Sequence, residues 1–174
     1  MVCSSQQARE KVCEKVIAMA IAVFPGSFDP PTLGHLDVLE RGAALFERVV
    51  VGVLQNPAKT PTFSQADRVS VFGEIVENRG LSNVEIREFD GLAVHFAESV
   101  GAQWILRGLR STHDFEFETP MALMNRSFGE GTVETVFLPA RPELSHIRGT
   151  LVREILKGGG DIAGFVPSEV LGRL

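Results

Sequence analysis

Short apolar runs alternate with amphipathic segments along most of this chain of 174 residues. Residues 49–54, for example, are apolar and rich in valine, a pattern typical of a buried strand. Their brevity also favours a strand over a helix. Further strands are expected at 20–24, 84–87, 103–106 and 133–138.

The segments between these runs carry apolar side chains at helical spacing. In residues 66–78, Val69, Phe72 and Ile75 fall on one face. Further helices are expected at 36–46, 92–100, 114–126 and 150–157. Pro120 should bend the helix at 114–126 or delay its start. Five strands alternating with helices predict an α/β fold, a doubly wound five-stranded parallel sheet of the Rossmann-like kind.

The composition is that of an ordinary globular protein, with 44% hydrophobic and 22% charged residues and a formal net charge of −5. This acidic balance argues against a general nucleic-acid binder, which usually carries a basic surplus. The longest apolar run, 16–24, is too short for a bilayer, which takes about 20 residues. The two cysteines, Cys3 and Cys13, fit neither a zinc site nor a disulfide framework, so a reduced, cytoplasmic protein is expected.

The first 18 residues are polar and charged and differ from the rest of the chain. We expect residues 1–18 to form an N-terminal extension outside the fold, with Met19 as the natural start. An additional helix is the alternative. Residues 19–174 show no internal repeat, no low-complexity tract and no sign of a second domain, so they are expected to form a single domain.

A loop rich in glycine and proline joins the first expected strand to the first expected helix, and it ends in Thr32-Leu33-Gly34-His35. Free backbone N–H groups at a helix start attract anions, and Gly34 would let a phosphate approach closely. His35 would add a donor or a positive charge. In parallel sheets, ligands bind outside the carboxyl ends of the strands. Segments 26–35, 56–59, 107–110 and 139–150 all follow such ends, so a phosphate site is expected there.

The Thr32–His35 segment resembles the T-x-G-H signature of the nucleotidylyltransferase superfamily. With Asn56-Pro57-Ala58-Lys59, Arg107-Gly108-Leu109-Arg110 and the run 144–153, the chain from Met19 onward resembles the phosphopantetheine adenylyltransferases. The resemblance implies an enzyme of coenzyme A biosynthesis that transfers AMP from ATP to 4′-phosphopantetheine, giving dephospho-CoA and pyrophosphate. It also implies direct in-line displacement without a covalent intermediate, Mg²⁺ bound with ATP, a homohexamer and feedback binding of CoA.

The resemblance assigns the catalytic roles to His35, Lys59 and Arg107. His35 would stabilise charge that develops on the α-phosphate, while Lys59 and Arg107 would hold the acceptor phosphate. Ser27 would bind the acceptor phosphate and ATP, with help from the Phe28 backbone. The other ATP contacts that it implies are Gly108, Leu109, Arg110, Glu118, Leu144, Ser145, His146, Ile147, Arg148, Gly149 and Thr150. The other phosphopantetheine contacts are Leu92, Ala93, Met124 and Asn125.

One block departs from the family pattern, because Arg148 and Gly149 replace two serines. Two hydroxyl donors near the ATP phosphates are thereby lost. We hypothesise that the Arg148 guanidinium compensates with a charge-assisted hydrogen bond. No metal ligand is assigned in the chain, since Asp114 and Glu116 suit the first turn of a helix. Mg²⁺ should arrive on the ATP phosphates and water.

Two other functions remain open from the sequence. A related nucleotidylyltransferase would use another acceptor, such as nicotinamide mononucleotide, although the 107–110 block weighs against it. A non-catalytic sensor would bind adenine nucleotide or CoA, and only the Arg148-Gly149 departure favours it. The dinucleotide fingerprint G-x-G-x-x-G is absent, which disfavours a hydride-transfer enzyme.

Overall fold

The computed structural model describes residues 20–55, 61–128 and 132–174. The extension 1–18, its boundary at Met19, and Lys59 lie outside these residues, so the expectations for them stay predictions. Among the described helices, none is both long and apolar enough to cross a membrane.

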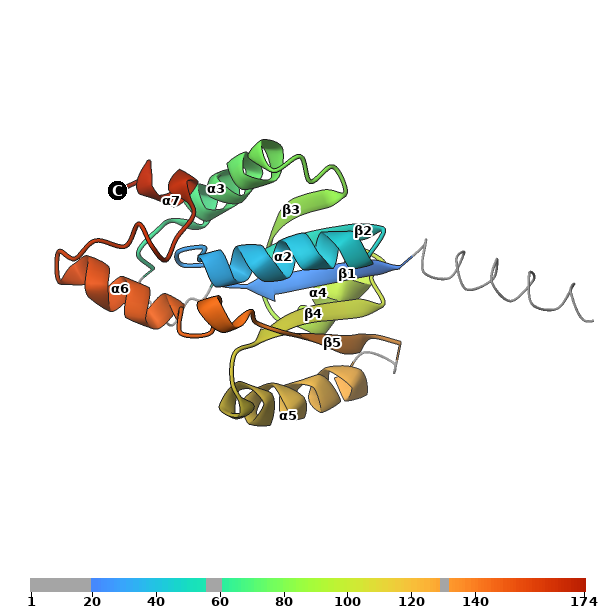
Figure 1. Cartoon of the computed structure of the whole chain (residues 1–174). Helices are drawn as coiled ribbons and strands as arrows, with labels where there is room; N and C mark the ends of the chain where they lie inside the picture. The colour runs from blue at the N-terminus through green and yellow to red at the C-terminus, as the bar shows by residue number, and fades with distance from the viewer. Residues whose placement is uncertain (1–19, 56–60, 129–131) are drawn as a thin grey trace, which may run out of the picture.

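Five parallel strands form one sheet in the order β3-β2-β1-β4-β5 (Figure 1), which confirms the predicted α/β fold. The strands are β1 (Ile21–Gly26), β2 (Arg48–Leu54), β3 (Val84–Phe89), β4 (Trp104–Leu109) and β5 (Glu134–Pro139). The strand order reverses between β1 and β4, the position where open α/β sheets bind their ligands. These two strands pair only at Ala22 with Trp104 and Val23 with Ile105. Their carboxyl ends therefore lie beyond the paired stretch and leave room for a ligand.

Helices cover both faces of the sheet, as a doubly wound fold requires (Figure 1). One face carries α2 (Leu33–Leu45), α3 (Gln65–Asn78), α6 (Gly149–Lys157) and α7 (Ser168–Leu171), and the other carries α4 (Ala93–Ser99) and α5 (Thr112–Phe128). A 3-10 turn, η1 (Pro142–Leu144), precedes α6. Strand β2 shows why helices cover both faces of the sheet, because its successive side chains point to opposite faces. Val49 and Val51 lie in the core under α2 and α3, while Val50 lies in the core under α4.

The structure differs from the sequence expectation mainly at element ends. Strand β4 runs three residues further than expected, so Arg107, Gly108 and Leu109 are its last residues and not part of the following loop. Helix α5 begins at Thr112 and continues through Pro120, which neither delays its start nor ends it. The proline leaves the carbonyl of Glu116 without its helical donor, and Glu116 is exposed, so water can replace that bond.

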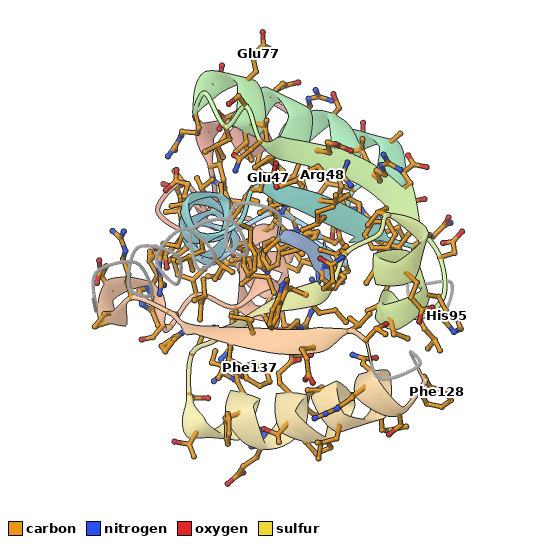
Figure 2. The ribbon with its side chains drawn as sticks, turned by 90° about the vertical axis from the view of Figure 1, so that its right-hand side faces the viewer. Glu47, Arg48, Glu77, His95, Phe128 and Phe137 are labelled. Carbon is orange, nitrogen blue, oxygen red and sulfur yellow. The ribbon has the colours of Figure 1, made fainter. Side chains whose placement is uncertain are left out.

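Helix α5 packs loosely on the edge strand β5. Phe137 points from β5 toward α5 (Figure 2), where its ring meets that of Phe115 at 5.9 Å in a T-shaped arrangement. None of the α5 side chains is buried. Phe117, Leu123 and Phe128 are 69%, 62% and 59% exposed, respectively. The helix therefore presents apolar side chains on the surface of the single chain.

Candidate active site

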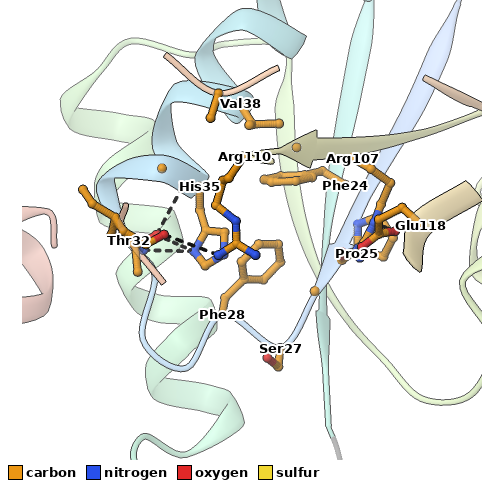
Figure 3. Close-up of a pocket in the computed structure, with 15 residues that line it drawn as sticks. Phe24, Pro25, Ser27, Phe28, Thr32, His35, Val38, Arg107, Arg110 and Glu118 are labelled. Carbon is orange, nitrogen blue, oxygen red and sulfur yellow. Dashed lines mark hydrogen bonds and ion pairs between the residues drawn. The ribbon is translucent and has the colours of Figure 1, made fainter. Parts of the chain in front are cut away.

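A cavity of about 230 Å³ lies where the carboxyl ends of β1 and β4 diverge (Figure 3). The end of β1, the following loop, the start of α2 and the end of β4 form most of its wall. Eight residues to which the resemblance assigns a substrate contact line it: Ser27, Phe28, His35, Arg107, Gly108, Arg110, Glu118 and Ile147. The structure thus brings together residues from four separate segments of the chain.

A larger cavity of about 600 Å³ adjoins the first one. The two share a wall made of Pro25, Gly26, Ser27, Arg107 and Glu118. Among the predicted phosphopantetheine contacts, Leu92, Ala93 and Asn125 line the larger cavity beside mostly apolar neighbours.

Met124 does not line this cavity, contrary to the sequence expectation, and is 52% exposed. Met121, Ala122 and Asn125 line it instead. At about 100° per residue, Met121, Ala122 and Asn125 span about 100° of the helix circumference, and Met124 lies about 60° outside that arc.

The loop after β1 holds Phe28 in an unusual backbone conformation. Its φ angle is +48°, in the left-handed region that side chains other than glycine rarely adopt. The Phe28 ring is buried and packs against Phe24 at 5.2 Å, Phe72 at 4.8 Å and His35 at 5.1 Å between ring centroids. Burial of the ring offsets the backbone strain, which is of order 1–3 kcal/mol, and fixes the loop below His35.

The T-x-G-H spacing forms a capping box at the start of α2. The Thr32 hydroxyl accepts a hydrogen bond from the His35 backbone N–H at 3.4 Å, and His35 Nδ1 accepts one from the Thr32 backbone N–H at 3.0 Å. Histidine takes the place of the glutamate that usually completes such a box. Because Nδ1 is the acceptor, the neutral imidazole carries its proton on Nε2.

The same environment keeps this imidazole uncharged. Burial in the cavity wall, together with the positive charges of Arg110 and Arg107, lowers the pKa of His35 from 6.5 to about 4. In Figure 3 the Arg110 guanidinium reaches toward the His35 ring. Of the two possibilities open from the sequence, a donor or a positive charge, the structure therefore supports a neutral Nε2–H donor at neutral pH.

The backbone donors at the start of α2 are mostly satisfied within the protein. Thr32 N–H and His35 N–H are used in the capping box, and the Leu33 N–H donates to the Phe165 carbonyl at 2.9 Å. Gly34 N–H has no hydrogen-bond partner among the described residues, and Gly34 lines the smaller cavity. One backbone donor, rather than a whole helix start, is thus available to an anion from this turn.

Arg107 and Glu118 form an ion pair in the wall between the two cavities. The guanidinium donates to both carboxylate oxygens of Glu118, at 2.8 and 2.6 Å, and to the Pro25 carbonyl at 2.8 Å. Glu118 thereby fixes the orientation of Arg107, and the guanidinium keeps further N–H groups for a ligand.

Arg110 is oriented in a similar way by Asp114, which accepts from Arg110 Nε at 2.8 Å and from Nη2 at 3.1 Å. Burial of Asp114 opposes its ionisation. Hydrogen bonds from the side chain and backbone of Arg110, with the charges of Arg110 and Arg148, nevertheless hold the pKa of this carboxyl below its usual value. Asp114 therefore anchors Arg110, a role consistent with its place in the first turn of α5.

The segment 144–150 reaches the smaller cavity only at Ile147, whose carbonyl accepts from Arg110 Nη1 at 3.4 Å. Arg148 is the N-cap of α6, is exposed, and makes no side-chain capping bond. The other predicted ATP contacts that do not line this cavity are Leu109, Leu144, Ser145, His146, Gly149 and Thr150. Their roles, like that of Arg148, stay predictions.

Three charged residues that the sequence analysis did not assign organise the loops around the site. The Asp29 carboxylate accepts from the backbone N–H groups of Thr62 and Phe63. Asp37 and Arg68 are buried, at 6% and 3% exposure. Both lie on helix faces that otherwise carry core residues, and a charge on such a face was the signal that could have identified them.

The described residues contain no group of three or more His, Cys, Asp or Glu side chains placed to hold a metal ion. Glu118, the carboxylate in the smaller cavity, is already paired with Arg107. The cations that line this cavity suit the binding of phosphates.

Comparison with known proteins identifies the family of this chain. The sequence model of the cytidylyltransferase-like family matches residues 23–155. A phosphopantetheine adenylyltransferase of Caldanaerobacter subterraneus is 45% identical over 156 residues, which cover 90% of this chain and 96% of that protein. One of Bifidobacterium longum is 47% identical over 153 residues, covering 88% and 91%.

A solved structure of a putative nicotinate-nucleotide adenylyltransferase from Vibrio parahaemolyticus shares the fold, with a TM-score of 0.60 and 21% identity over 87% of this chain and 90% of that one. At this identity the likeness concerns the fold alone. The family model and the relatives reach further: this chain is a nucleotidyltransferase enzyme of the cytidylyltransferase-like family and belongs, within it, to the phosphopantetheine adenylyltransferases.

Proposed function

We propose that this enzyme transfers AMP from ATP to 4′-phosphopantetheine, giving dephospho-CoA and pyrophosphate. The observation that carries the proposal is the pair of cavities that share Ser27 and Arg107. The smaller cavity offers His35 and Arg110 to the phosphates of a nucleotide. The larger cavity offers the mostly apolar wall that an extended pantetheine arm needs. The acceptor phosphate would lie at the shared wall, beside the α-phosphate of ATP.

In this arrangement an oxygen of the acceptor phosphate forms a bond to the α-phosphorus of ATP. The bond from that phosphorus to the bridging oxygen breaks, and pyrophosphate leaves with the electron pair. The acceptor phosphate is already ionised near neutral pH, so no protein base is needed to activate it. The contribution of the enzyme is therefore positioning and stabilisation of charge.

Three side chains would supply that stabilisation. Neutral His35 would donate its Nε2–H to an α-phosphate oxygen, where charge increases in the transition state. Arg107, held by Glu118, would orient the acceptor phosphate, and Arg110, held by Asp114, would face the β- and γ-phosphates. Mg²⁺ is part of the proposal as a companion of ATP, bound by its phosphates and by water.

The test is release of pyrophosphate from ATP with 4′-phosphopantetheine as the acceptor. We expect turnover with this acceptor and little with nicotinamide mononucleotide. His35→Ala should lower kcat roughly 10²–10³-fold, the usual cost of one preorganised donor, with a smaller effect on ATP affinity. His95→Ala is the matched control, because His95 is exposed and lines neither of the two cavities.

The outcomes separate the rival functions. Turnover that required nicotinamide mononucleotide would indicate another acceptor class. Binding of ATP or CoA without any pyrophosphate release would indicate a sensor. Either result would overturn the proposed reaction. A His35→Ala enzyme with the kcat of the wild type would refute the role proposed for His35.

A homohexameric assembly, feedback binding of CoA and a cytoplasmic location complete the proposal. Self-association is supported by α5, which has no buried side chain in the single chain and exposes Leu123 and Phe128. Light scattering during size-exclusion chromatography should report six copies for the wild type. Phe128→Asp should give smaller species if α5 lies in an interface, and Glu77→Asp on the exposed surface of α3 is the control. An unchanged mass for Phe128→Asp would remove α5 from the assembly contact.

A further inference from the structure

Arg68 is a cation in the interior of the protein. It lies near the start of α3 and is 3% exposed. Removing a guanidinium from water is unfavourable, and this burial lowers the pKa of Arg68 despite the opposing charges of Asp29 and Glu88. Among the described residues no carboxylate lies within ion-pair distance of it. The partners of this buried guanidinium are mainly backbone carbonyl groups, so the positions of those carbonyls indicate what Arg68 does.

The guanidinium donates to three backbone carbonyls from three different segments. Nη1 donates to the carbonyl of Ser27, in the loop after β1, and to that of Leu54 at 3.0 Å, at the end of β2. Nε donates to the carbonyl of Ser64 at 3.3 Å, the N-cap residue of α3. The ladder pairs β1 with β2 up to Gly26 and Val53, and this one side chain continues the connection by joining Ser27 to the end of β2.

Two of these three segments also line the larger cavity. Ser27 belongs to the wall that both cavities share, and Leu54 lines only the larger one. Asp29, two residues after Ser27, accepts from the backbone of Thr62 and Phe63 and so joins the same loop to the segment that leads into α3. The contacts of Arg68 therefore converge on the acceptor side of the site.

We propose that Arg68 is a positioning residue for the acceptor phosphate. This inference rests on the proposed function and extends it to a residue that touches neither substrate. The planar fork of Arg68 sets the distance between the Ser27 loop and the end of β2, and with it the place where the acceptor phosphate meets Ser27 and Arg107. A lysine keeps the charge but presents a compact ammonium group that cannot span the same carbonyls.

The test compares Arg68→Lys and Arg68→Met with the wild type in the pyrophosphate-release assay. We expect KM for phosphopantetheine to rise about tenfold or more in both variants, KM for ATP to rise less than about threefold, and kcat to fall less than KM rises. Calorimetric binding of phosphopantetheine without ATP provides a second readout that does not need turnover. It should weaken by a similar factor.

Two control variants, one at the residue that follows α3 and one within the helix, separate positioning from stability. Arg79→Lys makes the same chemical change at an exposed ion pair with Glu40 and should leave both KM values unchanged. Ile75→Val thins the core under α3 and should lower the melting temperature without moving KM for phosphopantetheine. If Arg68→Lys lowered only the melting temperature and bound phosphopantetheine like the wild type, Arg68 would be a structural residue and the inference would be wrong.

The design also distinguishes this inference from the proposed function. Should the wild type release pyrophosphate only with another phosphate acceptor, the proposed function would fail. The role of Arg68 would then be tested by comparing KM for that acceptor between the wild type and the two Arg68 variants. Should the wild type use phosphopantetheine while both Arg68 variants keep its KM, the proposed function would stand and the role of Arg68 would be refuted.

Discussion

Protonation of His35 should make this protein measurably less stable in mild acid. In the folded state the pKa of His35 is about 4, because of burial and the charges of Arg110 and Arg107, whereas an unfolded histidine titrates near 6.5. The folded pKa is depressed, so the stability due to the neutral ring is fully present above about pH 6.5 and is lost as the pH falls toward 4. Linkage between these two values gives a loss of about 2 kcal/mol at pH 5 relative to pH 7.

The perturbation that isolates this effect is His35→Asn. Asparagine has no titrating group, yet its carbonyl can still accept from the Thr32 N–H, which preserves part of the capping box. Urea unfolding of both proteins, followed by the fluorescence of the single tryptophan Trp104, should be measured at pH 7 and pH 5. The stability of the wild type should fall about 2 kcal/mol further than that of the variant between these two values.

Because the other groups titrate in both proteins, the difference between the two pH dependences belongs to His35. Parallel loss of stability in wild type and variant would refute the reasoning, since it would mean that the ring is charged or solvated in the folded state. An NMR titration gives a direct check: one imidazole should titrate near pH 4 in the wild type, and its signal should be absent from His35→Asn.

Three further substitutions test other parts of the site. Arg148→Ala should raise KM for ATP about tenfold if the guanidinium replaces the missing hydroxyls, since a charged hydrogen bond is worth roughly 1.5–3 kcal/mol; an unchanged KM for ATP would end that hypothesis. Gly108→Ala should lower stability to urea by about 1–3 kcal/mol, because the added Cβ would lie 2.7 Å from Val38 Cγ2. Asp37→Asn should lower the free energy of unfolding by about 1–3 kcal/mol, because Arg141 loses the charged partner that lies 2.8 Å away. The same variant should raise KM for ATP more than KM for phosphopantetheine, and equal effects on both KM values would contradict this.

The fold could be predicted because its signals are local and repeated. Short runs of β-branched residues mark the strands, and helical spacing marks the segments between them. The limits of β4 and α5 were less predictable. Arg107 and Gly108 look like loop residues, yet β4 continues through them because β5 pairs beside it, as in Arg107 with Phe137. Pro120 was expected to disturb α5, but the helix continues through it. The carbonyl that loses its helical donor belongs to Glu116, an exposed residue, so water can replace the bond.

The site could be predicted in part, because the T-x-G-H block begins the helix that follows β1 and the Arg-Gly-Leu-Arg block lies at the end of β4. The pairing of Arg107 with Glu118 could not be, since it depends on how α5 lies against β4. Nor does the sequence carry the neutral state of His35, which depends on burial and on two arginines distant in the chain. Such properties arise only when separate segments pack together, and single-residue patterns do not contain them.

Two buried charges of opposite sign organise the loops on the two sides of the proposed active site. Asp37, with 5% of its side chain exposed, pairs with Arg41 at 3.0 Å and with Arg141 at 2.8 Å, and Arg41 also donates to the Pro139 carbonyl. This cluster fixes the end of β5, beside the cavity that we propose for the nucleotide. Arg68 joins the loop after β1 to the end of β2, beside the cavity that we propose for the acceptor.

Each charge is expensive to bury, and well-packed apolar side chains of similar size often give equal or greater stability. Apolar packing, however, is not directional, while a carboxylate or a guanidinium holds its partners at fixed distances and angles. In-line transfer between two substrates requires both phosphates to be placed to within a fraction of an ångström. A buried anion on one side and a buried cation on the other therefore offer what core packing alone does not: independent alignment of the loops that, in the proposed reaction, would carry the two reacting phosphates.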